Sequence, residues 1–172
     1  PILEIPEAKW RDKGVQLVSL IKGFERTEKI IALLSIKEFS EDLFIQFYTS
    51  QGMIKKTSLA EYSTRRTKIQ ACGLKDKDYV IGAELVSEDK EVIIITEQGM
   101  SIRFNGNEVN PMGRAARGVK AIQLKGEDRV VFGSQIEKDG DMIVVTDQGI
   151  GKRTPIADYQ CQGRGGIGFR TL

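Results

Sequence analysis

The sequence predicts an all-β fold, a propeller-like array of repeated four-stranded blades. The first observation behind this prediction is a Thr-x-Gln-Gly motif that occurs at 49–52, 96–99 and 146–149. The second is its spacing of about 50 residues, which is typical of one propeller blade. The third is that apolar runs such as 92–95 do not alternate with polar residues. Strands of that kind are buried on both faces, as in stacked blades around an axis.

The first two strands of each repeat are expected to form a hairpin around this motif. An apolar run precedes each motif, a second short run follows its glycine, and a turn glycine between two such runs is a hairpin signal. The second run ends in basic residues in every copy. The expected first strands are 43–48, 92–95 and 142–145, and the expected second strands are 53–56, 100–103 and 150–153.

Two further strands complete each repeat. The fourth strand follows an acidic residue, for which capping of a turn is a better interpretation than carboxylate chemistry. Trp10, Tyr62 and Tyr159 follow the hairpins and are expected to pack between blades rather than to stack on bases. The expected third strands begin at 13–17, 68–72 and 117–122, the acidic residues are Glu28, Asp78 and Asp128, and the fourth strands are 29–33, 79–82 and 129–133.

The whole chain, 1–172, is predicted to be a single domain or a fragment of one. Two complete repeats at about 42–90 and 91–140 are flanked by partial repeats at 1–41 and 141–172. The first partial repeat lacks its opening strand, which we expect before Pro1. No apolar run reaches the length of a membrane helix and no signal peptide is present, so a cytoplasmic protein is expected.

The composition argues against an enzyme. The chain contains no histidine, which removes the commonest general base and metal ligand. Cys72 and Cys161 lie far apart, so neither metal spacing nor a disulfide framework is present. We therefore expect no catalytic residues, metal, cofactor or small-molecule substrate. The net charge is only +2, from 26 basic and 24 acidic residues, so any binding of nucleic acid must depend on where the charges lie.

Several stretches resemble a known family. They are Ile5-Pro6-Glu7-Ala8, the segment 111–120 (Pro-Met-Gly-Arg-Ala-Ala-Arg-Gly-Val-Lys) and the segment 149–155 (Gly-Ile-Gly-Lys-Arg-Thr-Pro). They are similar to the C-terminal β-pinwheel domain of the A subunits of bacterial DNA gyrase and topoisomerase IV. A box-like loop resembles the family's Gln-Arg-Arg-Gly-Gly-Lys-Gly heptapeptide but departs from it at Gly163 and Ile167. This loop consists of Gln162, Gly163, Arg164, Gly165, Gly166, Ile167 and Gly168.

The resemblance implies a partial array from a six-blade disc that binds, bends and wraps duplex DNA without catalysis. The parent would be an ATP-dependent type II topoisomerase, and the partners would be its ATPase B subunit, together with the rest of the A subunit. Gyrase is preferred as the parent. Topoisomerase IV is kept as a close second, because Lys68-Ile69 departs from the usual Gly-Val of the pattern. A propeller that serves as a protein-interaction scaffold is the alternative.

Wrapping DNA requires cations at regular intervals along one edge, because a duplex presents one negative charge per ~1.7 Å. The repeat supplies such intervals at the ends of the second strands and in the loops that follow them. Glycines in the loops would let the backbone approach phosphates, although glycine also serves tight turns. The predicted DNA-binding residues are Lys9, Arg11, Lys13, Lys55, Lys56, Arg65, Arg66, Lys68, Arg103, Arg114, Arg117, Lys120, Lys152, Arg153, Arg164 and Arg170.

Overall fold

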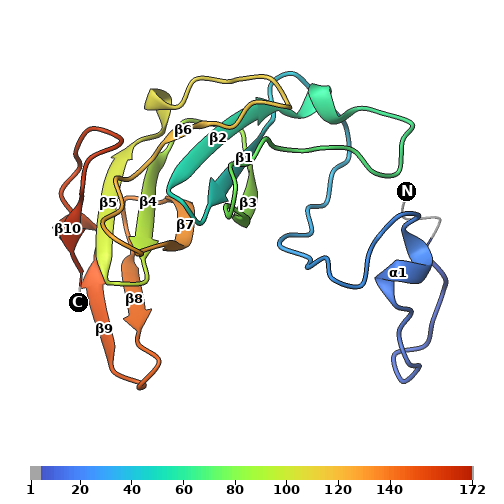
Figure 1. The fold of residues 1–172 in the computed structure, drawn as a ribbon, viewed down its shortest axis with the longest axis horizontal. Coiled ribbons are helices and arrows are strands. Elements are labelled where there is room, and N and C mark those ends of the chain that lie inside the picture. The colour runs from blue at the N-terminus through green and yellow to red at the C-terminus, as the bar shows by residue number, and fades with distance from the viewer. Residues whose placement is uncertain (1–4, 172) are drawn as a thin grey trace.

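Antiparallel sheets stand side by side in an arc in the computed structural model, which describes residues 5–171 (Figure 1). The predicted all-β class with four-stranded blades is confirmed by two four-stranded sheets and a two-stranded third sheet within that range. No helix in the described range is long and apolar enough to cross a membrane.

Each predicted hairpin forms, and the Thr-x-Gln-Gly motif is its turn. The glycine of each motif adopts a left-handed conformation, with φ of 78° at Gly52, 75° at Gly99 and 77° at Gly149. The threonine hydroxyl accepts the backbone N–H of the residue after the glycine, at 3.1–3.2 Å in all three copies. The hairpins are β1 (Phe44–Thr49) with β2 (Met53–Ser58), β4 (Glu91–Thr96) with β5 (Met100–Asn105), and β8 (Asp141–Val145) with β9 (Gly151–Pro155).

Each hairpin is followed by a short 3₁₀ turn, and an inner strand then adds to the first strand of the first two hairpins. The inner strands are β3 (Val80–Val86), paired with β1, and β7 (Val130–Ile136), paired with β4. Asp78 Oδ1 accepts the Gln51 N–H at 2.9 Å, and Asp128 Oδ1 accepts the Gln98 N–H at 3.0 Å. This confirms that the acidic residues cap turns. The 3₁₀ turns are η2 (Leu59–Tyr62), η3 (Gly106–Glu108) and η4 (Ile156–Asp158).

The outer strand of each four-stranded sheet comes from the following repeat. β6 (Val119–Lys120) pairs with β2, and β10 (Phe169–Arg170) pairs with β5. The sheet orders are therefore β3-β1-β2-β6 and β10-β5-β4-β7. A blade thus takes three strands from its own repeat and one from the next, which ties successive repeats together.

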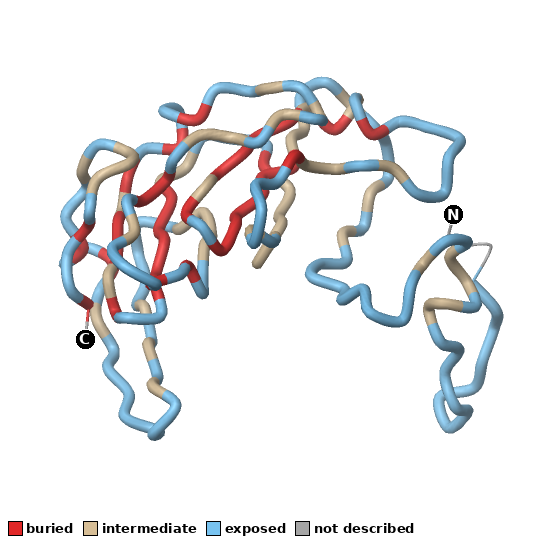
Figure 2. Tube along the Cα trace, in the orientation of Figure 1, coloured by how far each residue is buried: buried red, intermediate tan, exposed pale blue. Residues whose placement is uncertain are grey.

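The strands predicted at 13–17, 29–33 and 68–72 are not formed. Residues 5–43 contain the short helix α1 (Leu17–Leu20) and otherwise no helix or strand. The physical reason is that a strand needs a neighbour for its backbone N–H and C=O groups. The described residues offer no unpaired hairpin edge beside these segments, and Leu33 is 95% exposed. Most of residues 5–43 are exposed, as the pale blue trace of this segment in Figure 2 shows.

The core lies within and between the hairpins. Val92, Ile93, Ile94 and Ile95 are all buried, so the prediction that this strand is covered on both faces is confirmed. One cluster combines Tyr48 and Ile54 of the first hairpin with Val92, Ile94, Ile102 and Phe104 of the second. Full burial of each such side chain contributes about 1.5–3 kcal/mol.

A polar network also joins the first two blades. The Tyr48 hydroxyl donates to Glu84 Oε1, while Ser134 Oγ donates to Glu84 Oε2 at 2.9 Å and the Gln135 N–H donates to Oε1 at 2.8 Å. Burial raises the pKa of Tyr48 well above its ordinary value, with the neighbouring Glu84 acting in the same direction. Glu84 of β3 therefore holds the inner strand β7 of the next repeat.

Candidate nucleic-acid interface

The basic residues at the ends of the second strands occupy equivalent positions, but each is paired with an acid from its own repeat. Lys56 Nζ lies 2.5 Å from Asp89 Oδ1. Arg103 Nε donates to Glu91 Oε2 at 2.9 Å, and Arg153 Nε donates to Asp141 Oδ2 at 2.8 Å. The three cations are thus compensated within their blades and do not form a free row of charge.

Two of the predicted DNA contacts, Lys55 and Lys56, are wrong because both residues are buried, at 0% and 4% exposure. Lys55 Nζ donates to the carbonyls of Ala71, at 2.9 Å, and Arg114. Desolvation by burial lowers the pKa of Lys55. Lys55 and Lys56 are buried because the loop of the next repeat covers β2. In this contact the Met112 N–H donates to the Lys56 carbonyl at 2.9 Å.

Arg103 is half-buried and links its blade to the next repeat. Its Nη1 donates to the carbonyls of Ile156, at 2.8 Å, and Tyr159, at 3.0 Å. Together with the Glu91 pair these contacts occupy the guanidinium. The prediction that Arg103 faces DNA is therefore not supported by its surroundings.

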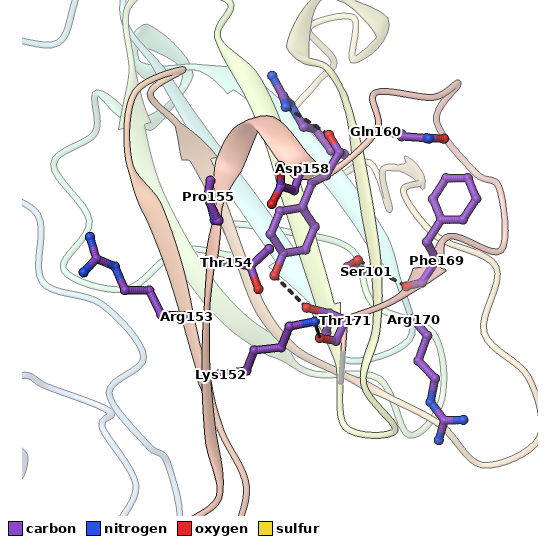
Figure 3. Close-up of a pocket in the computed structure, with 12 residues that line it drawn as sticks. Ser101, Lys152, Arg153, Thr154, Pro155, Asp158, Gln160, Phe169, Arg170 and Thr171 are labelled. Carbon is purple, nitrogen blue, oxygen red and sulfur yellow. Dashed lines mark hydrogen bonds between the residues drawn. The ribbon is translucent and has the colours of Figure 1, made fainter.

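A groove beside β9 gathers several of the remaining cations. Lys152, Arg153 and Arg170 line it together with Asp158 and Thr171 (Figure 3). Lys152 Nζ donates to the Thr171 carbonyl at 3.3 Å, and the Tyr159 hydroxyl shares a 2.6 Å hydrogen bond with Thr171 Oγ1. These contacts hold the segment after β10 against β9.

Most of the remaining predicted DNA-binding residues are accessible. Arg114 and Arg164 are half-buried, whereas the others are exposed, with Lys68 paired to Glu28 at 2.9 Å. The exposed cations are Lys9, Arg11, Lys13, Arg65, Arg66, Lys68, Arg117, Lys120, Lys152, Arg153 and Arg170.

The loops after η2, η3 and η4 follow one another along the outer edge of the arc, and each of the last two reaches back to the preceding repeat (Figure 1). They span 63–73, 109–118 and 159–168. We call them the outer loops. The last one contains the box-like loop, in which Gly163 is exposed with open space around it.

Two outer-loop glycines serve packing instead of phosphate approach. Gly118 and Gly168 have φ of 89° and 74°. A Cβ at these positions would lie well under 3.0 Å from the carbonyls of Ile54 and Ser101. Only glycine lets β6 and β10 approach the hairpins so closely.

The aromatic residues that follow the hairpins divide into two groups. Tyr62 and Tyr159 are buried, at 8% and 9% exposure, so their predicted packing role is confirmed. Trp10 is 86% exposed, so the same prediction is wrong for it, since residues 5–43 form no blade around the ring.

Comparison with known proteins identifies the architecture. Residues 1–37, 47–87, 90–136 and 140–170 match the family described as DNA gyrase C-terminal domain, beta-propeller. The chain belongs to this family. The DNA gyrase A subunit of Clostridium acetobutylicum is 52% identical over 98% of the chain, and that of Chlamydia pneumoniae is 36% identical over 99%. The chain spans about a fifth of the length of these relatives, 20% and 21%.

Two solved structures of the gyrase and topoisomerase IV C-terminal domains share the fold. The C-terminal domain of DNA topoisomerase IV superposes with a TM-score of 0.94 at 31% identity, covering 99% of this chain and 53% of that one. The DNA gyrase A C-terminal domain gives 0.78 at 25% identity, covering 92% and 52%. The predicted family and propeller-like fold are therefore confirmed. The curated relatives are A subunits of gyrase, which favours gyrase.

The sequence did contain a signal for the burial of Lys55. The equivalent residue in the next repeat is Ile102, at 1% exposure. A position that holds a buried isoleucine in one repeat can therefore be an interior position in another, although Lys152 at the same position of the third hairpin is exposed. Glu61 and Glu108, which lie at equivalent positions in η2 and η3, were not among the predicted site residues, although both contact an outer-loop arginine.

Proposed function

We propose that this chain binds duplex DNA along its outer loops, bends it, and does so without reading its sequence. The observation that supports this most directly is that the outer loops and the outer strands that follow them, β6 and β10, carry exposed cations from successive repeats along one edge. These cations are Arg65 and Arg66 in one repeat, Arg117 and Lys120 in the next, and Arg170 in the last. The strand-end residues Lys55 and Lys56 have no part in it.

Contacts of this kind act on the phosphate backbone. Binding by Lys and Arg releases counterions from DNA, so the affinity depends on the number of phosphates neutralised rather than on the bases. Bending a duplex around the edge costs on the order of a few kcal/mol, which is offset by the additional contacts that bending permits.

In the parent protein, the domain would present a DNA segment to the cleavage core of an ATP-dependent type II topoisomerase. Its partners would be duplex DNA, the ATPase B subunit, and the remainder of the A subunit, in the bacterial cytoplasm. The 52% identity to the Clostridium gyrase supports gyrase as the parent, with negative supercoiling as the reaction that wrapping serves.

Salt-dependent binding tests the proposal. The affinity for a labelled duplex should fall steeply with added salt and be the same for unrelated sequences. Replacing Arg117 and Lys120 with Gln should reduce the slope of log K against log salt by about 1.8, because each phosphate contact contributes about 0.9. The matched control replaces Lys37 and Lys138, which are exposed and lie outside the outer loops. Absence of binding at low salt would refute the proposal and favour a protein-interaction scaffold.

A further inference from the structure

The outer loops carry a repeated set of contacts that the proposed DNA binding does not use. The Arg114 backbone N–H donates to Glu61 Oε2 of η2 at 2.7 Å. One repeat later, the Arg164 backbone N–H donates to Glu108 Oε2 of η3 at 2.9 Å. In both cases an acid in the 3₁₀ turn of one repeat holds the outer loop of the next.

The side chain of each arginine makes a second contact with the same preceding repeat. Arg114 Nη1 donates to the Gln70 carbonyl at 2.5 Å. Arg164 Nη1 donates to the Lys120 carbonyl, and its Nε donates to the Glu108 carbonyl at 3.3 Å. Gln70 and Lys120 are separated by the same 50 positions as the two arginines, so this contact also recurs with the repeat.

Backbone hydrogen bonds between successive outer segments support the same connection. The Gly73 N–H donates to the Ala116 carbonyl at 3.0 Å, and the Gln123 N–H donates to the Gly166 carbonyl at 2.8 Å. Each outer loop is thus fixed to its predecessor at the acid, at the outer carbonyl and along the backbone. We call the contacts of Arg114 with Glu61 and Gln70, and of Arg164 with Glu108 and Lys120, the arginine latches.

We infer that Arg114 and Arg164 are positioning residues that set the path of the bound DNA rather than phosphate contacts. Their guanidinium groups are engaged with backbone carbonyls and are half-buried. The accessible cations Arg117, Lys120 and Arg170 lie three to six residues after them in the chain. The latches therefore fix the spacing between cation groups of adjacent repeats, and this spacing determines how tightly a duplex can curve. The inference rests on the proposed function.

The test separates affinity from bending. Arg114→Lys with Arg164→Lys preserves the charge but removes the planar donor fork that a latch requires. The salt slope for a labelled duplex should stay unchanged, since the number of cations is the same. Protein-assisted ring closure of a short duplex should fall roughly tenfold, which is the effect of losing ~1.4 kcal/mol, about one charge-assisted hydrogen bond. The control is Arg26→Lys, an exposed arginine outside the latches, the outer loops and the proposed DNA contacts.

A second set of variants acts through the acids. Glu61→Ala with Glu108→Ala should lower ring closure and accelerate amide hydrogen exchange at Arg114 and Arg164. The control is Asp158→Ala, because Asp158 occupies the same position in η4 and its carboxylate accepts no hydrogen bond within residues 5–171. Far-UV circular dichroism confirms that each variant folds.

The outcomes are distinct. Wild-type ring closure in the lysine and alanine variants would overturn the inference. A salt slope reduced by about 1.8 in the charge-removing variant Arg114→Gln with Arg164→Gln would also overturn it, because it would make both arginines phosphate contacts. If the wild-type chain bound no DNA, the proposed function would fail, while faster exchange at the two arginines in the alanine variants would still establish the latches themselves.

Discussion

The exchange of strands between repeats predicts that Gly118→Ala is much more destabilising than Gly149→Ala. Both glycines are left-handed, with φ of 89° and 77°. Alanine therefore costs about 1–2 kcal/mol of backbone strain at either position. The surroundings differ, because a Cβ at 118 meets the Ile54 carbonyl at well under 3.0 Å, whereas a Cβ at 149 has nothing within 4 Å.

The additional cost at 118 comes from moving β6 away from β2. The displacement weakens the neighbouring bonds from the Ala121 N–H to the Gly52 carbonyl, 2.7 Å, and from the Met112 N–H to the Lys56 carbonyl, 2.9 Å. Each backbone bond contributes about 0.5–1.5 kcal/mol. We therefore expect a total loss of about 2–5 kcal/mol for Gly118→Ala, against about 1–2 kcal/mol for Gly149→Ala.

Urea unfolding followed by far-UV circular dichroism measures both values, provided that the transitions are two-state with equal m. Equal losses in the two variants would show that close docking of the exchanged strand contributes nothing, and the reasoning would be refuted.

Three further predictions concern the ion pairs, the buried lysine and the thiols. Glu91→Ala should lower the free energy of unfolding by about 1–3 kcal/mol, because it leaves the half-buried Arg103 without its acidic partner. Asp141→Ala should lower it by only about 0–1 kcal/mol, because the side chain of its partner Arg153 is 71% exposed. Urea unfolding of both variants measures the two losses, and equal losses would contradict the prediction. Burial lowers the pKa of Lys55 in the folded state, so the folded state binds fewer protons and stability rises with pH between that lowered pKa and the ordinary one near 10.5. In a Cys72→Ser background, unfolding measured from pH 8 to 10 should lose this rise on Lys55→Met; a rise that persists would assign it to another group. Burial raises the pKa of both Cys72 and Cys161, so each thiol should react with a disulfide reagent more slowly at pH 8 than free cysteine does, and a rate equal to free cysteine would contradict this.

Local signals in the sequence were sufficient to predict the hairpins. A left-handed glycine after Thr-x-Gln and a run of residues such as 92–95 specify a turn and a doubly buried strand from neighbouring positions alone. The repeat of about 50 residues also predicted which positions are equivalent, and the family that the chain resembles.

Equivalent positions in the repeat did not predict which side chains are buried and which are exposed. Lys56, Arg103 and Arg153 are in register, yet the first is buried and the third is exposed. The difference arises because the next repeat's loop covers β2, whereas within residues 5–171 no later loop lies over β9. Burial of a strand depends on which distant segment packs on it.

Pairing of strands was likewise decided only by the tertiary structure. The segments 13–17 and 29–33 have the composition of strands but no hairpin edge beside them, whereas Val119–Lys120 finds one in the preceding repeat. The amino-acid sequence alone determined the turns, the period and the apolar runs, because these depend on local conformation and hydrophobicity. The tertiary structure decided which cations face solvent and which bind carbonyls, because a backbone hydrogen bond and a buried charge each require a partner from another part of the chain.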